Sequence, residues 1–97
     1  MEYIQVMEAT TSDPEAMFAA EKEWYEASEG KRTVRRSIVT RDRNNPDRYV
    51  IVVFFDSYES AMENSELPET QAFAGKMAAA LDGPMVFHDL DLVQDRT

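Results

Sequence analysis

The segment from Tyr49 to Phe55 constrains the fold of this chain more than any other, because it is apolar on both sides. Its β-branched and aromatic residues form a continuous run, which is typical of a strand buried within a sheet. Alternate side chains of a strand point to opposite faces. The run therefore divides into two apolar sets, which are Val50, Val52 and Phe54 on one face and Ile51, Val53 and Phe55 on the other. A sheet that contains this strand needs an apolar cover on each face.

Turn and capping residues divide the rest of the chain into elements. Residues 2–9 alternate as a strand does, and Ser12-Asp13-Pro14-Glu15 predicts the start of a helix that runs to Ser28 and stops at Gly30. Residues 33–43 predict a second strand, joined to 49–55 by the turn-forming residues 44–47. A second helix starts near residue 57, breaks at Pro68 and ends at Gly83-Pro84, before a last strand over 85–93.

This order of elements predicts one α+β domain over residues 1–97, of the ferredoxin-like βαββαβ kind, with a four-stranded antiparallel sheet. The first and third strands are central in that arrangement. Two helices cover only one face of the sheet, and the second apolar face of residues 49–55 would remain in water. We expect a second copy of the chain to cover it, packed face to face about a twofold axis, so the sequence predicts a homodimer.

Composition and charge exclude several classes of protein. A chain of 97 residues has room for one domain, and its net charge of −9 disfavours binding to nucleic acid or to an anionic membrane. The arginines between residues 32 and 48 are interpreted as the solvated surface of a strand pair. No apolar run approaches the roughly 20 residues that cross a bilayer, and the N-terminus lacks a signal-peptide pattern, so we expect a cytoplasmic protein.

A resemblance to a known family rests on the run YVIVVFFDSYESA from Tyr49 to Ala61, followed by Asn64-Ser65 and by LPET from Leu67 to Thr70. These residues resemble the strand-3 to helix-2 segment of antibiotic-biosynthesis-monooxygenase-like domains. The order of elements agrees over nearly the whole chain. The resemblance implies two subunits that form a dimeric α+β barrel, with a ligand between the sheet and the helices of one subunit. It also implies oxidation of aromatic polyketides or quinols without a cofactor, or degradation of haem.

The chain departs from the catalytic patterns of both branches of that family. Members of the anthrone-oxidising type place an asparagine in strand 3, a tryptophan at its end and a tyrosine early in helix 2. The corresponding positions here are Ile51, Phe55 and Ala61. Members that degrade haem carry an asparagine on strand 1, then a tryptophan and a histidine on helix 2, which has no histidine here. The resemblance therefore implies a cofactor-independent monooxygenase whose usual catalytic residues are absent.

His88 is the only histidine, and it alternates with apolar residues of the last strand. One interpretation is a partly buried histidine that is hydrogen-bonded to a neighbour. The other is a catalytic base, because an oxygenase without a cofactor must deprotonate a phenol or quinol before oxygen can accept an electron. A metal site needs several converging ligands, which one histidine does not supply, so no metal or other cofactor is predicted.

Five further residues are candidates for ligand binding. Trp24 and Tyr25 on the first helix, with Phe73 on the second, either line an aromatic pocket or fill the core. Asn64 either caps a freed backbone group near the helix break or orients an oxygen of the ligand. Arg36 either pairs with a carboxylate across the dimer or meets an acidic ligand.

Two hypotheses follow for the function. The chain is a cofactor-free monooxygenase that acts on a small aromatic or quinol-like compound, or it is a non-catalytic homodimer that binds a small molecule or serves as an interaction module. A cavity between sheet and helices that His88 reaches favours the enzyme. A solid core around Trp24 and Phe73 favours the second hypothesis.

Overall fold

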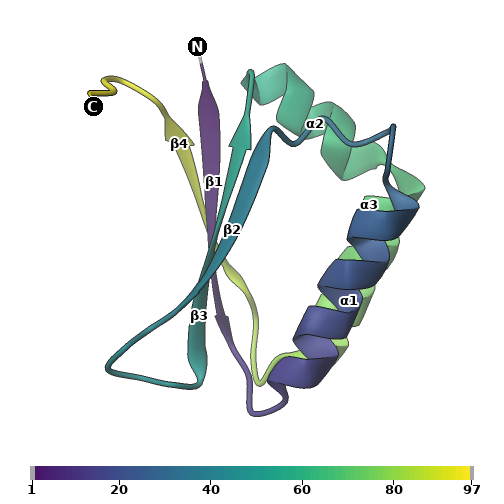
Figure 1. The fold of residues 1–97 in the computed structure, drawn as a ribbon, viewed down its shortest axis with the longest axis vertical. Helices are drawn as coiled ribbons and strands as arrows, with labels where there is room; N and C mark the ends of the chain where they lie inside the picture. Colours follow the sequence, from purple (N-terminus) through teal and green to yellow (C-terminus); the bar gives the residue numbers. More distant parts are fainter. Residues whose placement is uncertain (1, 97) are drawn as a thin grey trace.

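The computed structural model describes residues 2–96, and its elements follow the predicted order (Figure 1). They are β1 (Tyr3–Thr10), α1 (Pro14–Ala27), β2 (Arg36–Arg41), β3 (Arg48–Phe55), α2 (Tyr58–Glu66), α3 (Pro68–Ala80) and β4 (Val86–Asp91). The strands form one antiparallel sheet in the order β2-β3-β1-β4, so β3 and β1 are central. All three helices lie on the same side of the sheet. The βαββαβ prediction is confirmed.

Capping residues set the helix starts. The Asp13 side chain accepts a hydrogen bond from the Ala16 N–H at 3.2 Å, directly before Pro14 in the first turn of α1. Ser57 does the same for α2, accepting from the Ser60 N–H at 3.1 Å. Pro68 begins a separate helix, α3, because Leu67 before it takes an extended conformation. The predicted break at Pro68 is confirmed.

The second strand is shorter than the predicted range 33–43, because Thr33 bonds to α2 instead of to a strand. Its N–H donates to Asn64 Oδ1 at 3.3 Å, and its hydroxyl donates to the carbonyl of Ser60 at 2.6 Å. These bonds hold the segment before β2 against the helix layer, so the strand begins only at Arg36. The last strand is also shorter than predicted, and it ends at Asp91.

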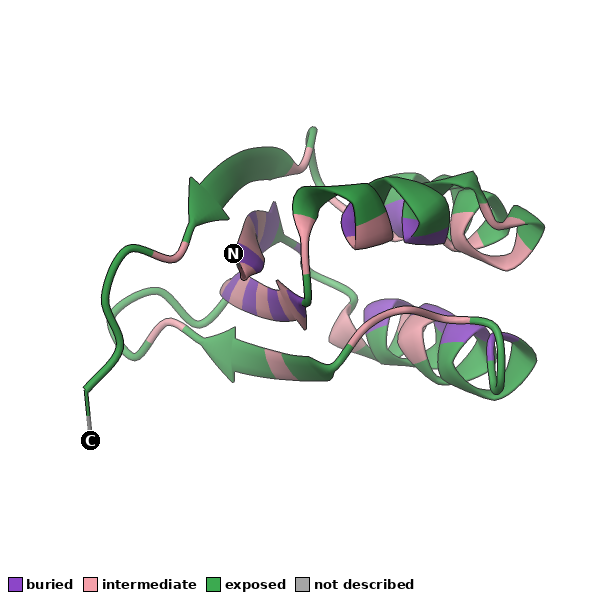
Figure 2. Cartoon of the chain, turned by 90° about the horizontal axis from the view of Figure 1, so that it is seen from above, coloured by how far each residue is buried: buried purple, intermediate pink, exposed green. Residues whose placement is uncertain are grey.

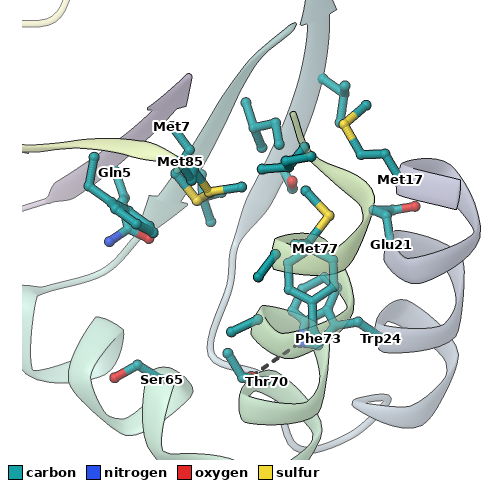
Figure 3. Close-up of a pocket in the computed structure, with 18 of the residues that line it drawn as sticks. Gln5, Met7, Met17, Glu21, Trp24, Ser65, Thr70, Phe73, Met77 and Met85 are labelled. Atoms are coloured by element: carbon teal, nitrogen blue, oxygen red, sulfur yellow. Dashed lines mark hydrogen bonds between the residues drawn. The ribbon is translucent and has the colours of Figure 1, made fainter. Parts of the chain in front are cut away.

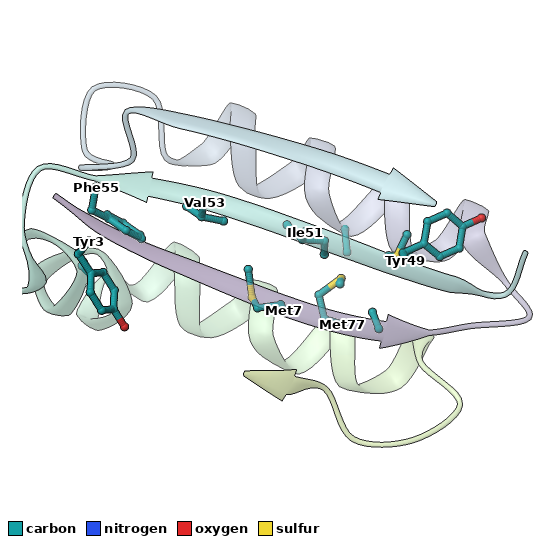
Figure 4. Packing of buried hydrophobic residues seen from close by; sticks show 11 residues of the cluster. Tyr3, Met7, Tyr49, Ile51, Val53, Phe55 and Met77 are labelled. Carbon is teal, nitrogen blue, oxygen red and sulfur yellow. The ribbon is translucent and has the colours of Figure 1, made fainter. Parts of the chain in front are cut away.

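The two faces of β3 differ in burial, as the alternation predicts. The helix-facing side chains Tyr49, Ile51, Val53 and Phe55 are buried, and in the register Ile51 is paired with Met7 of β1 (Figure 4). The alternate residues of the strand are only half-buried in one chain. The edge strands β2 and β4 are mostly exposed (Figure 2). We call the sheet surface that faces away from the helices the open face.

A buried threonine ties the helix layer to the end of β1. Thr11 is 1% exposed, and its hydroxyl donates to the carbonyl of Ala80 at 2.7 Å while accepting from the Asp13 N–H at 2.9 Å. The start of α1 and the end of α3 therefore share one anchor. This anchor sets one end of the space between the helices and the sheet.

Candidate functional site

A cavity of about 800 Å³ lies between the helix-facing side of the sheet and the helices (Figure 3). Its walls are predominantly apolar. On the sheet side they include Met7 and Met85, and on the helix side Trp24, Phe73 and Met77. Methionine side chains adapt to ligands of varied shape, and aromatic rings offer flat surfaces for stacking. The volume is that of a pocket for a small organic molecule.

The edge strands leave this cavity open to solvent. Val39 of β2 and Phe87 of β4 both line it, and they are 37% and 56% exposed. The central strands supply its buried floor, with Ile51 and Val53 on β3. A ligand can therefore enter from an edge of the sheet and reach an apolar interior.

Two predicted residues, Trp24 and Phe73, form the helix-side wall together. Their ring centroids lie 5.8 Å apart with an interplanar angle of 39°. The Trp24 indole N–H donates to Thr70 Oγ1 at 3.1 Å, which fixes the orientation of a ring that is 9% exposed (Figure 3). Both residues pack against each other and still line the cavity, so the space around them is not a solid core.

Asn64 is a buried polar side chain that also lines the cavity. It is 6% exposed and lies near the end of α2, where its Oδ1 accepts the hydrogen bond from the Thr33 N–H. The amide does accept from a backbone N–H, but the expectation that it caps a group freed at the helix break is wrong. The capped group belongs to the segment before β2 and not to the break itself.

Sequence reasoning missed most of the polar residues of the cavity, among them Gln5 and Glu21. Gln5 shares the helix-facing side of β1 with Met7, and its Nε2 donates to Asp89 Oδ1 at 3.4 Å. Glu21 is the only charged side chain among the lining residues. The position of Glu21 could have been predicted from the helical spacing, because it lies four residues after Met17 and three before Trp24, on the same side of the helix.

His88 does not line the cavity, and the expectation that it reaches a ligand there is wrong. In the register it is paired with Val6, which places it on the open face, whereas its neighbour Phe87 faces the helices. Its Nε2 lies 2.7 Å from Glu8 Oε2, and Glu8 also pairs with Arg48. The hydrogen bonds from Arg48 and His88 lower the pKa of Glu8 below its usual value. The structure thus shows a histidine hydrogen-bonded to a neighbour, as one interpretation held, but the side chain is 48% exposed and not partly buried.

Arg36 and Tyr25 also lie outside the cavity. Arg36 is paired with Phe54 on the open face, with its guanidinium 5.7 Å from that ring, so it does not meet a ligand between sheet and helices. Within residues 2–96 it forms no ion pair, and a partner across a dimer stays a prediction. Tyr25 is 55% exposed under the guanidinium of Arg32 at 4.0 Å, and the expectation that it lines the pocket is wrong.

The described residues contain no group of three or more histidine, cysteine, aspartate and glutamate side chains that could hold a metal ion. None of the helices in residues 2–96 is long and apolar enough to cross a membrane. The cytoplasmic location, and the absence of a nucleic-acid partner, stay predictions.

Comparison with solved structures identifies proteins that have the same fold. A proposed antibiotic biosynthesis monooxygenase from Caulobacter crescentus CB15 superposes with a TM-score of 0.84 at 12% identity, covering 96% of this chain and 91% of that one. SnoaB, a cofactor-independent oxygenase from Streptomyces nogalater, superposes with a TM-score of 0.82 at 14% identity, covering 97% of this chain and 95% of SnoaB. Rv0793 from Mycobacterium tuberculosis superposes with a TM-score of 0.82 at 11% identity, covering 100% of both chains. The chain has the antibiotic-biosynthesis-monooxygenase-like fold.

The resemblance stated from residues 49–70 is confirmed at the level of the fold by these neighbours. No family model and no curated protein matches the chain. At such low identity the likeness describes the path of the backbone, and side chains on the same fold support different chemistries. The function must therefore be argued from the cavity.

Proposed function

We propose that the protein is a cofactor-independent monooxygenase that oxidises a small aromatic or quinol-like compound in the cavity between the sheet and the helices. The observation that carries the proposal is the cavity of about 800 Å³ with its wall of Trp24, Phe73 and methionines. The same fold is found in SnoaB, a cofactor-independent oxygenase. A bound aromatic compound would lie against rings and thioethers and would displace water from the apolar floor of the cavity.

Such a site suits an oxidation in which the substrate itself supplies the electrons. Loss of a proton gives a carbanion-like anion that reduces O₂, and a methylene group is converted to a carbonyl with release of one water molecule. Glu21 is the only ionisable lining side chain, so we assign it, in place of His88, as the proton acceptor. We assign the Asn64 amide, which lines the cavity, as the donor of a hydrogen bond to the substrate oxygen on which negative charge develops. The apolar walls exclude water from the part of the substrate that they contact.

The test is oxygen uptake with a panel of hydroquinones and anthrones. We expect uptake with the wild type, and a rate at least about 100-fold lower in Glu21→Gln, since a positioned base contributes roughly 10²–10⁴-fold. Glu26→Gln, on the exposed side of α1, is the matched control and should keep the wild-type rate. His88→Ala should keep it too, because the side chain is outside the cavity. Absence of uptake above the protein-free rate contradicts the proposal.

A second candidate function is a non-catalytic protein that binds a small molecule. It is favoured by the lining itself, which offers one carboxylate and no histidine, and by the apolar side chains at Ile51, Phe55 and Ala61. Under this alternative the panel compounds bind in the cavity but are recovered unchanged. Chromatography of the mixture after incubation separates the two functions.

We further propose that the working form is a homodimer joined through the open face. Ile4, Val6, Val52 and Phe54 are only half-buried in one chain, and Leu90 beside them is 45% exposed. An apolar surface that extends across three strands is typical of an interface. Light scattering should give the mass of two chains for the wild type and of one for Val52→Glu. Ala79→Glu, on the exposed side of α3, should remain dimeric. A wild-type mass of one chain contradicts the dimer.

A further inference from the structure

We infer that the cavity selects a neutral aromatic ligand that carries an acceptor oxygen, such as a ketone, and that the Asn64 Nδ2 amide binds this oxygen. The inference deepens the proposed function, on which it rests for the location of the site. It concerns recognition, and it can be tested without any turnover. It is carried by the fixed orientation of the amide, the absence of an internal partner for its nitrogen, and the charge of the lining.

The surroundings of Asn64 determine which end of its amide is left for another molecule. The Thr33 backbone N–H can only donate, so the atom 3.3 Å from it must be the amide oxygen. Thr33 is itself held in place, because its hydroxyl donates to the Ser60 carbonyl at 2.6 Å. The oxygen end of the amide is therefore occupied by the protein. The NH₂ end is the one left for another molecule.

The Asn64 amide nitrogen has no hydrogen-bond partner in the described part of the chain, residues 2–96. Across residues 2–96 it donates no hydrogen bond, although the side chain is 6% exposed. Among the described residues, Glu69 Oε2 is the one side-chain polar atom that is fully buried and has no hydrogen-bond partner. The Asn64 nitrogen also lacks a partner, so it is not fully buried. The amide nitrogen is thus accessible in a residue that lines the cavity. A donor that stays within reach of solvent in a nearly buried residue is available to an acceptor oxygen on a ligand.

The charge of the lining argues against an anionic ligand. None of the lining residues is a lysine, arginine or histidine, and the single charged member, Glu21, is acidic. The whole chain carries a net charge of −9. A carboxylate or phosphate would enter an apolar space without a counter-charge, which is costly. A neutral carbonyl needs only the one donor that Asn64 provides, while the rings of Trp24 and Phe73 pack against the aromatic part.

Equilibrium dialysis with three ligands of one ring system tests this recognition. The ligands are 2-acetonaphthone, which has a neutral acceptor oxygen, 2-ethylnaphthalene, which has none, and 2-naphthoate, which is an anion. We expect the ketone to bind about fivefold more tightly than the hydrocarbon, the contribution of a typical hydrogen bond. The naphthoate should bind most weakly of the three.

Two variants of Asn64 remove the donor in different ways. Asn64→Asp keeps an oxygen for the Thr33 N–H but has no NH₂ group, and Asn64→Leu keeps approximately the volume. Each should abolish the advantage of the ketone while 2-ethylnaphthalene binds within about twofold of its wild-type affinity. Glu63→Gln, on the exposed side of the same helix, should keep the ketone preference. Circular dichroism verifies that the variants fold.

A measurement on the wild type keeps the inference testable even if both variants unfold. In nitrogen-15 NMR spectra, the Asn64 side-chain amide signal should move on addition of 2-acetonaphthone and not on addition of 2-ethylnaphthalene. Equal affinities for these two ligands, tighter binding of 2-naphthoate, or an unmoved Asn64 signal would overturn the inference. Ketone preference without oxygen uptake would contradict only the monooxygenase. Oxygen uptake without ketone preference would contradict only the ligand class.

Discussion

The hydroxyl group of Tyr3 connects the central strand β1 to the edge strand β4, and its removal gives a sharp test of the structure. Tyr3 is 4% exposed, and its hydroxyl donates to Asp89 Oδ1 at 2.6 Å. The ring contacts Phe55, with centroids 6.1 Å apart, and meets Tyr58 edge-on at 5.4 Å. Tyr3→Phe keeps this packing and removes only the hydroxyl group. It therefore isolates one hydrogen bond between the strands.

The magnitude follows from the kind of hydrogen bond that is lost. A bond to a charged group contributes about 1.5–3 kcal/mol, and the exposed Asp89 carboxylate recovers part of this from water when it is freed. We expect the free energy of unfolding to fall by about 1–2 kcal/mol at neutral pH. Urea unfolding at one protein concentration, followed by far-UV circular dichroism, measures it. Tyr58→Phe is the control, since that side chain is 52% exposed, and its effect should stay below about 0.5 kcal/mol.

The same hydroxyl group should make stability depend on alkaline pH. Burial, with the hydrogen bond to Asp89, raises the pKa of Tyr3 above its usual value. The unfolded chain loses this proton near a pH of about 10, while the folded chain still holds it. The stabilisation is therefore complete below that pH and is lost as pH rises toward the folded pKa. The difference between wild type and Tyr3→Phe should shrink above it. Equal stabilities at neutral pH, or a difference independent of pH, would refute this reasoning.

Three further changes probe the anchor of the helices, the open face and the cavity wall. Thr11→Val removes two buried hydrogen bonds and should lower the free energy of unfolding, measured in urea, by about 2–3 kcal/mol. The control is Thr10→Val at the exposed neighbouring residue, which should change the free energy of unfolding by less than about 0.5 kcal/mol. Similar losses in both would contradict the anchor. Hydrogen bonds from Arg48 and His88 lower the pKa of Glu8 in the folded chain below the value of 4.5 that it has when unfolded. The ionised Glu8 side chain therefore stabilises the fold above pH 4.5, and this stabilisation is lost as pH falls. Acid unfolding of Glu8→Gln should therefore depend less on pH below that value, and an identical acid profile would exclude the ion pair. Phe73→Ala should lower the free energy of unfolding by about 2 kcal/mol, which is less than the loss for a fully buried phenylalanine. It should also weaken the affinity for 2-acetonaphthone in equilibrium dialysis, and an unchanged affinity would argue against a contact between the ring and the ligand.

Much of the fold could be predicted because local signals agree with the global arrangement. The two-sided apolar run at residues 49–55 indicated a central strand, and Pro68 marked the boundary between two helices. The length of β2 could not be predicted, because Thr33 bonds to a helix that is distant in the sequence. Alternation and turn residues carry no information on such contacts.

The candidate site was less predictable for a physical reason. Alternation in β4 separates His88 from its neighbours, but both faces of this sheet are apolar, so hydrophobicity does not indicate which one meets the helices. Only the pairing of His88 with Val6 decides it. Tyr25 shows the converse problem, since an aromatic ring beside an apolar stripe can lie in solvent beneath an arginine. Trp24, Asn64 and Phe73, which the sequence offered as candidates, all line the cavity, and their role in ligand binding stays a prediction.

The alternation of β3 also bears on how such a protein can diverge over generations. Ile51 and Val53 form part of the cavity floor, whereas Val50 and Val52 belong to the open face. Substitutions at odd-numbered positions can thus alter which molecule is accepted while the surface available to a second chain is preserved. Even-numbered positions can change assembly while ligand choice is retained. One strand of eight residues carries two independent sets of mutable positions. If the proposed dimer forms through the open face, a duplicated copy could gain another ligand while its assembly is unchanged.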